Sequence, residues 1–461
     1  MNILLVYLPF CTPASPPYSL TYLASFLKAN SKHNIDVLDL NLEFHKKKFP
    51  EYHKYYQEGK FDDYEEKTTE FNKITSKLYL KNNRAVVNDE KPELFEEMLE
   101  KIQDKKPDLV LFSLVYSSQA FYAYALLKEL DNVVIGGPAV NDKLRKLAKC
   151  LNNEVELLNY IGEDGKQDAS VKHDELDCDI VPDFSIYNLK DYFCPKPVIP
   201  IKTSSTCYYK GCTFCTHFTS QPYCEYNLEL IKQTIKKSKQ KHFFLIDDMI
   251  HEKRLLELAK MIKPLKVNYT CQLKPKDISK ETLIKLKQSG LSMVIWGVES
   301  GNNRVLKLMN KGTHKEEIEK VLKDSYEVGI KNVVYIMFGF PGETKEEFLE
   351  TIQFLKDNDK YIDLVSVSIF GLQKDSQVYK NPEKFKITKI IEEQRTVLEP
   401  KLTYEVSEGL SNKEAIKLRN NYKKTIEKIN KYPRKMNFFR EHMLCSIKKP
   451  SFHWYECKDK H

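Results

Sequence analysis

Short apolar runs that alternate with helical segments constrain the fold of this 461-residue chain more than any other feature. In the first third, such runs occupy residues 2–10, 34–42, 108–118 and 132–140, and segments with apolar residues at helical spacing lie between them. Apolar runs separated by helices are typical of a parallel sheet that helices cover on both faces. Residues 1–165 are therefore expected to form a Rossmann-like α/β domain.

Two segments of the first 200 residues depart from this pattern. Residues from about 43 to 106 are polar and charged, and they are interpreted as a helical insertion between strands. Residues 166–198 are acidic and lack a sustained period, so we expect a linker between two domains.

Strand–helix alternation returns at residue 199. Six apolar runs follow, and the helical segments 279–290 and 315–329 both end in glycine, as helix C-termini often do. Six repeats are too few for an eight-unit barrel and favour a partial, TIM-like (β/α)6 barrel over residues 199–375. Residues 376–461 are lysine-rich and are expected to form a helical C-terminal region.

Composition narrows the classes of partner. The net charge is +8, but 65 of the 73 basic residues are lysines, whereas bidentate phosphate recognition favours arginine. We therefore do not expect nucleic acid as a partner, although a basic surface suits an acidic peptide or nucleotide substrate.

Apolar segments long enough for a membrane are missing from the sequence. No run of eighteen apolar residues occurs, and the apolar start has no basic region before it, so we expect a buried strand rather than a signal peptide. A cytoplasmic location follows as the expectation, and the 11 cysteines would there be ligands or buried thiols.

Three of the cysteines, Cys207, Cys212 and Cys215, lie within nine residues directly after an apolar run. A loop that leaves the carboxyl end of a barrel strand opens into the site of a β/α barrel. Gly211 gives this loop the freedom to fold back, so that the three thiolates can converge. Three thiolates can hold three irons of a 4Fe-4S cluster and leave the fourth iron open.

A structural zinc site is the alternative interpretation of the three cysteines. Zinc prefers four closed ligands, and His217 or Cys224 could supply the fourth. Zinc ribbons normally bring a second paired motif, however, and none occurs in this sequence. A zinc-stabilised interaction module is therefore the minor hypothesis.

Four motifs in order, "CYYKGCTFC", "IDD", "GVESG" and "GFPGET", resemble the radical S-adenosylmethionine (SAM) superfamily over about residues 199–375. The resemblance implies a 4Fe-4S cluster on the three cysteines, with SAM chelating the unique iron. The spacing C-x4-C-x2-C is one residue longer than the commonest family spacing. Such a longer gap also occurs among members with an N-terminal cobalamin-type domain.

The resemblance also implies residues that bind SAM. Phe214, the aromatic residue before the last cysteine, is expected near the adenine, and Glu299 with Ser300 is expected to hold SAM. Arg304 could pair with the SAM carboxylate, or it could form an ordinary Glu–Arg surface pair.

Two further motifs end strands on the side where a barrel site opens. Asp247 and Asp248 could accept hydrogen bonds from the SAM amino group, or one of them could cap a helix. Gly339 and Pro341 lie in a turn that the resemblance puts beside the adenine, where glycine permits close approach of the backbone.

The first domain resembles the cobalamin-binding domain that precedes many radical SAM cores. Ser113, Gly136 and Gly137 lie at strand ends, where open α/β sheets bind ligands. The D-x-H-x-x-G signature of base-off cobalamin enzymes is absent from the sequence. Cobalamin is the expected cofactor, and the alternative is a domain that only caps the barrel.

The resemblance implies reductive cleavage of SAM to a 5′-deoxyadenosyl radical, with electrons from a donor such as flavodoxin or ferredoxin. We expect a cobalamin-dependent C-methyltransferase that acts on a peptide or another small molecule of secondary metabolism. The alternative is a cobalamin-independent radical SAM enzyme that catalyses a rearrangement or bond formation. Sulfur insertion into tRNA would need three more grouped cysteines, but the earlier ones are scattered at Cys11, Cys150, Cys178 and Cys194. Cys445 and Cys457 are interpreted as idle, and no residue is identified as catalytic.

Overall fold

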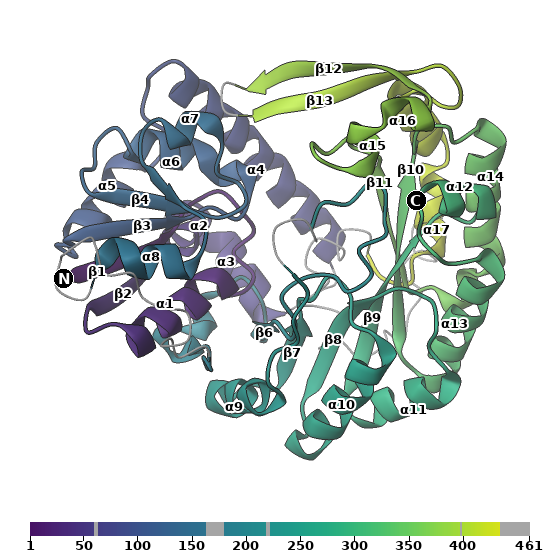
Figure 1. Cartoon of the computed structure of the whole chain (residues 1–461), viewed down its shortest axis with the longest axis horizontal. Coiled ribbons are helices and arrows are strands. Elements are labelled where there is room, and N and C mark those ends of the chain that lie inside the picture. Colours follow the sequence, from purple (N-terminus) through teal and green to yellow (C-terminus); the bar gives the residue numbers. More distant parts are fainter. Residues whose placement is uncertain (60–62, 163–178, 218–221, 397–398, 434–461) are drawn as a thin grey trace. The chain divides into compact units, whose positions relative to one another are not determined.

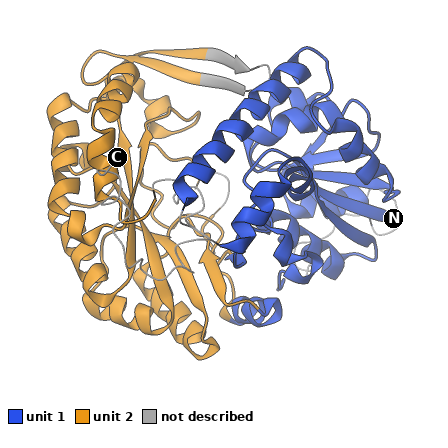
Figure 2. Cartoon of the chain, turned by 180° about the vertical axis from the view of Figure 1, so that it is seen from behind, with its two compact units in different colours: residues 1–200, 229–239, 394–400 blue, residues 201–228, 240–393, 401–461 orange. Residues whose placement is uncertain are grey.

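The computed structural model describes two compact units (Figure 2). The first contains residues 1–200, 229–239 and 394–400, and the second contains residues 201–228, 240–393 and 401–461. The structure describes residues 1–59, 63–162, 179–217, 222–396 and 399–433. For the described residues between 393 and 401, it describes the backbone alone.

A five-stranded sheet forms the centre of the first unit, and its strand order is β2-β1-β3-β4-β5 (Figure 1). All of its neighbouring strands are parallel, which confirms the predicted Rossmann-like domain. The strands are β1 (Asn2–Tyr7), β2 (Asn34–Asp39), β3 (Leu109–Ser113), β4 (Val133–Gly136) and β5 (Lys149–Leu151). The sequence did not indicate β5, because three residues are too few to form a recognisable apolar run.

Helices surround this sheet, and four of them make up the predicted insertion at residues 43–106. The insertion helices are α2 (Leu40–Lys48), α3 (Pro50–Glu58), α4 (Tyr64–Val87) and α5 (Phe95–Gln103). The others are α1 (Tyr18–Asn30), α6 (Ala120–Leu126), α7 (Asp142–Arg145), α8 (Glu154–Ile161) and, after the linker, α9 (Leu228–Ser238). Short 3-10 helices are η1 (Ser117–Gln119), η3 (Phe184–Ile186) and η4 (Leu189–Asp191).

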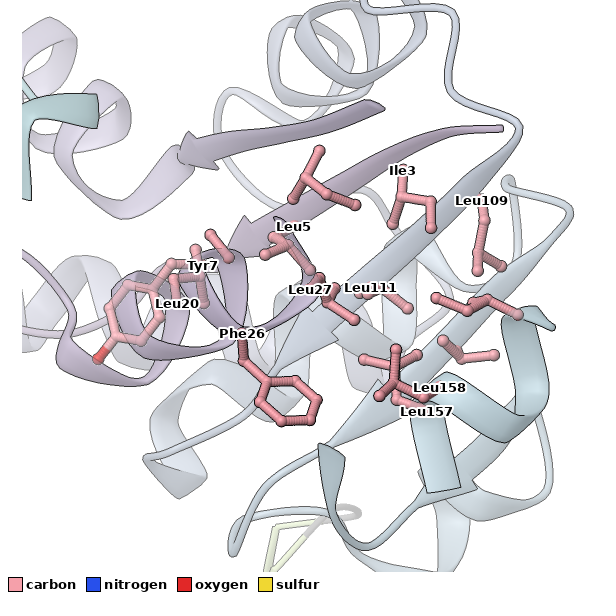
Figure 3. Close-up of a cluster of buried hydrophobic side chains, with 14 of the residues drawn as sticks. Ile3, Leu5, Tyr7, Leu20, Phe26, Leu27, Leu109, Leu111, Leu157 and Leu158 are labelled. Carbon is pink, nitrogen blue, oxygen red and sulfur yellow. The ribbon is translucent and has the colours of Figure 1, made fainter. Parts of the chain in front are cut away.

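One face of the first sheet packs on α1 and α8 (Figure 3). Alternate residues of β1 and β3 reach this core, because side chains of a strand alternate between its two faces. Full burial of one such aliphatic side chain contributes about 1.5–3 kcal/mol. The buried cluster includes Ile3, Leu5, Tyr7, Leu20, Phe26, Leu27, Leu109, Leu111, Leu157 and Leu158.

The second unit is built on a six-stranded sheet in which every strand lies beside its neighbour in sequence. The pairs from β7 to β11 are parallel, and the consecutive order confirms the predicted partial (β/α)6 arrangement. The strands are β6 (Val198–Ile201), β7 (His242–Leu245), β8 (Asn268–Leu273), β9 (Leu291–Glu299), β10 (Lys331–Phe338) and β11 (Leu364–Ile369).

Helices follow these strands and cover one face of the sheet (Figure 1). They are α10 (Glu252–Ile262), η5 (Lys263–Leu265), α11 (Lys280–Gln288), α12 (Asn303–Leu308), α13 (Lys315–Val328), α14 (Lys345–Asp357) and η6 (Asp359–Tyr361). The Tyr269 hydroxyl lies 2.8 Å from the Ser289 hydroxyl after α11, so Tyr269 on β8 points to this helical layer. Gly329 and Gly290 follow α13 and α11 at φ 83° and 110°, which confirms both predicted helix ends.

The described part of the C-terminal region, residues 376–433, is only partly helical, which corrects the expectation of a helical region for these residues. After α15 (Gln377–Lys380) and η7 (Pro382–Phe385), a hairpin forms from β12 (Ile387–Thr396) and β13 (Glu399–Val406). Its β-branched and aromatic residues favour strands, which the lysine-rich composition obscured. Helices α16 (Asn412–Asn421) and α17 (Lys423–Ile429) follow.

Three cysteines of the sequence, Cys178, Cys445 and Cys457, lie outside the described residues. Among the helices that the structure describes, none has the length and apolar character needed to cross a membrane.

Candidate functional site

The loop that carries Cys207, Cys212 and Cys215 follows β6 and is fixed to the turn after α12. The Thr213 backbone N–H donates to the Met309 carbonyl at 3.0 Å. The Asn310 side-chain amide donates to the Gly211 carbonyl at 2.7 Å, and the Tyr209 hydroxyl donates to the Asn310 carbonyl at 2.8 Å. These bonds hold the loop at the carboxyl end of the sheet, where a β/α barrel has its site.

The thiols of Cys207, Cys212 and Cys215 are partly buried, free of disulfides and close enough to influence one another. Burial raises the pKa of Cys212, and it raises the pKa of Cys215 to about 11. Negative charge on the neighbouring cysteines raises both further, whereas a hydrogen bond from the His217 backbone favours the Cys215 thiolate. Deprotonation of Cys212 and Cys215 in this site therefore requires a cationic partner.

Soft thiolate ligands are the donor set that iron–sulfur clusters use, so these residues fit the cluster that the sequence predicted. Among the described side chains, no three His, Cys, Asp or Glu residues gather as they would around a single metal ion. The three predicted cysteines lie in one anchored loop, and the cluster itself stays a prediction.

Asp247 fixes the segment that leads into the cysteine loop. Its carboxylate accepts hydrogen bonds from the Thr203 N–H at 3.0 Å, the Thr203 hydroxyl at 3.1 Å and the Ser204 hydroxyl at 2.6 Å. It does not cap α10, since His251 occupies the cap position of that helix. With its side chain buried and engaged, Asp247 has a structural role that the sequence did not indicate.

Asp248, the next residue, is half-exposed and pairs with His217. The Asp248 Oδ1 lies 2.9 Å from the His217 Nδ1, and this hydrogen bond raises the pKa of the imidazole. His217 is two residues beyond Cys215, so the pair lies at the edge of the cysteine loop. Binding of SAM by Asp248 stays a prediction.

Glu299 ends β9 in the left-handed region at φ 67°, which is uncommon for a residue with a side chain. Its Oε1 accepts a hydrogen bond from the Lys311 Nζ at 3.0 Å, and both side chains are largely buried. A Cβ on Gly297 would lie 2.8 Å from the Lys311 Nζ, so this glycine leaves room for the pair. Burial opposes the Lys311 charge, but Glu299 and the Cys212 thiolate raise its pKa.

Sequence reasoning missed Lys311 and a second buried lysine, Lys274. The Lys274 Nζ lies 3.6 Å from the centroid of the Tyr209 ring, a cation–π contact inside the cysteine loop. The charges of both lysines lower the pKa of Cys212, against the larger effect of burial. The sequence did carry one signal for Lys274, because this residue comes directly after β8, at the end of the sheet where sites form.

Phe214 and the "GFPGET" turn meet in one apolar cluster, which also includes Val305, Met309, Met337 and Phe340. Gly339 has φ 72°, and a Cβ there would lie 2.6 Å from the Cβ of Ala415, while Pro341 is buried. Phe214 and Phe340 of the turn thus belong to one cluster, and contact of Phe214, Gly339 and Pro341 with SAM stays a prediction.

Arg304 and Ser300 attach the segment after β9 to α14. The Arg304 guanidinium makes a two-pronged ion pair with Glu347 and donates to the Gly342 carbonyl at 2.6 Å. The Ser300 hydroxyl is fully buried, 3.1 Å from that of Thr351. Arg304 thus forms a Glu–Arg pair, as in the alternative interpretation, and binding of SAM by Arg304 and Ser300 stays a prediction.

In the first unit, Ser113, Gly136 and Gly137 lie at the carboxyl ends of β3 and β4, as predicted. The strand order reverses between β1 and β3, and such a switch point is where sheets of this order bind ligands. The Ser113 hydroxyl lies 3.0 Å from that of Ser19 at this point. Gly137 has φ 111°, and a Cβ there would lie 2.3 Å from the Leu114 carbonyl oxygen. The backbone conformation therefore requires glycine at this position.

Comparison with known proteins identifies a domain within the chain. Residues 201–355 match the model of the Radical SAM superfamily. An uncharacterized methyltransferase from Pyrococcus horikoshii is 22% identical over 313 residues, which cover 58% of this chain and 67% of the relative. Seven other curated relatives match over segments that span 19–60% of their own lengths.

Two solved structures share the fold of most of the chain. The cobalamin-dependent SAM radical enzyme OxsB with bound aqua-cobalamin has a TM-score of 0.62 at 14% identity, covering 93% of this chain and 67% of OxsB. The radical SAM methyltransferase TsrM from Kitasatospora setae, with cobalamin and a [4Fe-4S] cluster bound, has a TM-score of 0.57 at 15% identity, covering 82% and 74%. Residues 201–355 therefore form a radical SAM domain, and the chain shares its fold with the cobalamin-bound structures of OxsB and TsrM.

Proposed function

We propose that this chain is a cobalamin-dependent radical SAM C-methyltransferase, in which Cys207, Cys212 and Cys215 hold a 4Fe-4S cluster. The observation that carries the proposal is the loop of these cysteines, which hydrogen bonds to Met309 and Asn310 anchor at the carboxyl end of the sheet. When bound, such a cluster supplies the electron that cleaves SAM to a 5′-deoxyadenosyl radical. Cobalamin, when bound, supplies a methyl carrier.

The residues around the loop suit the charged methionine end of SAM. Glu299 offers a carboxylate to an ammonium group, and Lys311 offers an ammonium to a carboxylate, within one buried pair. Hydrogen bonds between charged groups are about twice as strong as those between neutral groups. Glu299 and Lys311 would therefore orient the methionine end of SAM with only small movements of their side chains. Phe214 and the turn of Gly339 and Pro341 would form the apolar wall on the adenine side.

The first unit supports the cobalamin part of the proposal. Its strand order leaves a switch point between β1 and β3, where the end of β3 carries Ser113. Both cobalamin-bound relatives share the fold over more than four fifths of the chain. A small-molecule or peptide substrate, an electron donor such as flavodoxin or ferredoxin, and a cytoplasmic location complete the proposal.

Anaerobic reconstitution of the chain with iron, sulfide and hydroxocobalamin tests both cofactors. We expect about four irons per chain and the visible spectrum of a bound corrinoid. Alanine at Cys207, Cys212 or Cys215 should abolish the cluster, whereas Cys224→Ala, an exposed cysteine of the same segment, should keep it. A cluster without bound corrinoid would refute the cobalamin-dependent methyltransferase and favour a cobalamin-independent radical SAM enzyme.

A further inference from the structure

Two buried ammonium groups lie beside the cysteine loop, a costly placement for positive charge. Lys274 is 6% exposed and Lys311 is 4% exposed. The Lys274 Nζ lies 3.6 Å from the centroid of the Tyr209 ring, and the Lys311 Nζ lies 5.9 Å from the centroid of the Phe214 ring. Both rings belong to the cysteine loop, so both charges lie beside the residues that would hold the proposed cluster.

The two lysines differ in how their charge is balanced. Lys311 has Glu299 at 3.0 Å. Within the described part of the chain, the Lys274 ammonium makes no hydrogen bond or ion pair and lies only on the ring of Tyr209. Burial lowers the pKa of the Lys274 ammonium, whereas the negative charge of Asp277 raises it. Lys274 is thus the buried cation that lacks a carboxylate in contact.

Tyr209 connects the Lys274 ammonium to the cysteine loop. Its ring is confined, because a Cβ on Gly211 would lie 2.7 Å from the ring and a Cβ on Gly312 would lie 2.4 Å from the hydroxyl. The hydroxyl is also bonded to the Asn310 carbonyl at 2.8 Å. A ring held in this way gives the Lys274 ammonium a fixed contact at a residue two positions from Cys207.

We infer that Lys274 is the uncompensated cation that stabilises the reduced form of the cluster held by the three cysteines. This inference rests on the proposed function. One electron from an external donor adds one negative charge to the cluster and breaks no bond, and a fixed positive charge in a poorly solvated site favours that state. The charge of Lys311, by contrast, is balanced by Glu299 at 3.0 Å.

Redox titration of the reconstituted protein without SAM tests the inference independently of catalysis. The reduced cluster is measured by electron paramagnetic resonance in the wild type, in Lys274→Met and in Lys210→Met. Lys210 is a matched control, since it is an exposed lysine of the same loop. We expect the reduction equilibrium constant of Lys274→Met to fall at least about tenfold, or about 59 mV, and that of Lys210→Met to change less than about threefold.

The outcomes separate the inference from the proposed function. Equal midpoint potentials in the wild type and Lys274→Met overturn the inference, and so does a loss of SAM affinity without a change in midpoint. If Lys274→Met takes up no iron, Lys274→Arg decides: a cluster with a near wild-type midpoint supports the inference, and no cluster overturns it. A wild type that takes up no iron and sulfide refutes the proposed function itself.

Discussion

Replacing Asp247 by alanine should destabilise the second unit and loosen the cysteine loop. The carboxylate accepts bonds from the Thr203 N–H, the Thr203 hydroxyl and the Ser204 hydroxyl at 3.0, 3.1 and 2.6 Å. A hydrogen bond to a charged group contributes about 1.5–3 kcal/mol, and bonds that share one carboxylate are not additive. We therefore expect the free energy of unfolding of this unit to fall by about 3–5 kcal/mol.

Chemical denaturation followed by the fluorescence of Trp296, which is fully buried in β9, measures this change. The second tryptophan, Trp454, is replaced by phenylalanine in all variants. Asp248→Ala is the matched control, because Asp248 is half-exposed with one ion pair, and it should change stability by less than about 1 kcal/mol. Equal stability of Asp247→Ala and the wild type, with a loss of SAM affinity alone, would refute the structural role and restore the SAM-binding hypothesis.

Two further predictions concern the second unit. Burial raises the pKa of Glu343 from 4.5 to about 8, so between these pH values the folded state binds one proton more than the unfolded state. The free energy of unfolding should therefore fall by about 3–5 kcal/mol as the pH rises from 4.5 to about 8. Glu343→Gln should remove this dependence, and an unchanged slope of unfolding free energy against pH would count against it. Gly290→Ala should destabilise by more than about 2 kcal/mol, since φ is 110° and the new Cβ would lie 2.0 Å from the Val267 carbonyl oxygen. Gly371→Ala, which meets nothing within 4 Å, should change stability by less than about 1 kcal/mol in the same thermal or denaturant assay.

Local signals in the sequence predicted much of the fold. The apolar runs gave both parallel sheets, and the glycines after α11 and α13 marked the helix ends, because each signal depends on neighbouring residues alone. The hairpin of β12 and β13 was missed, since its composition resembles that of the lysine-rich helices around it. Strand β5 was too short to recognise.

The site was only partly predictable, because its charges are arranged by tertiary structure. The three cysteines are grouped in sequence and could be identified from their spacing. Lys311 and Glu299 are twelve residues apart, and Lys274 reaches Tyr209 across 65 positions, so no local pattern joins them. Arg304 and Asp247 occupy motif positions, yet their partners Glu347 and Thr203 come from other elements. Motifs thus locate a site, and packing decides which of its polar residues are already engaged.

Reductive cleavage of SAM by the reconstituted chain tests the central claim most directly. With dithionite under anaerobic conditions, the wild type should carry about four irons and form 5′-deoxyadenosine, and so should Cys224→Ala. The variant with alanine at Cys207, Cys212 and Cys215 should form none. Formation of 5′-deoxyadenosine by that triple variant, or about one zinc per wild-type chain in place of iron, would contradict the assignment of the three cysteines as cluster ligands.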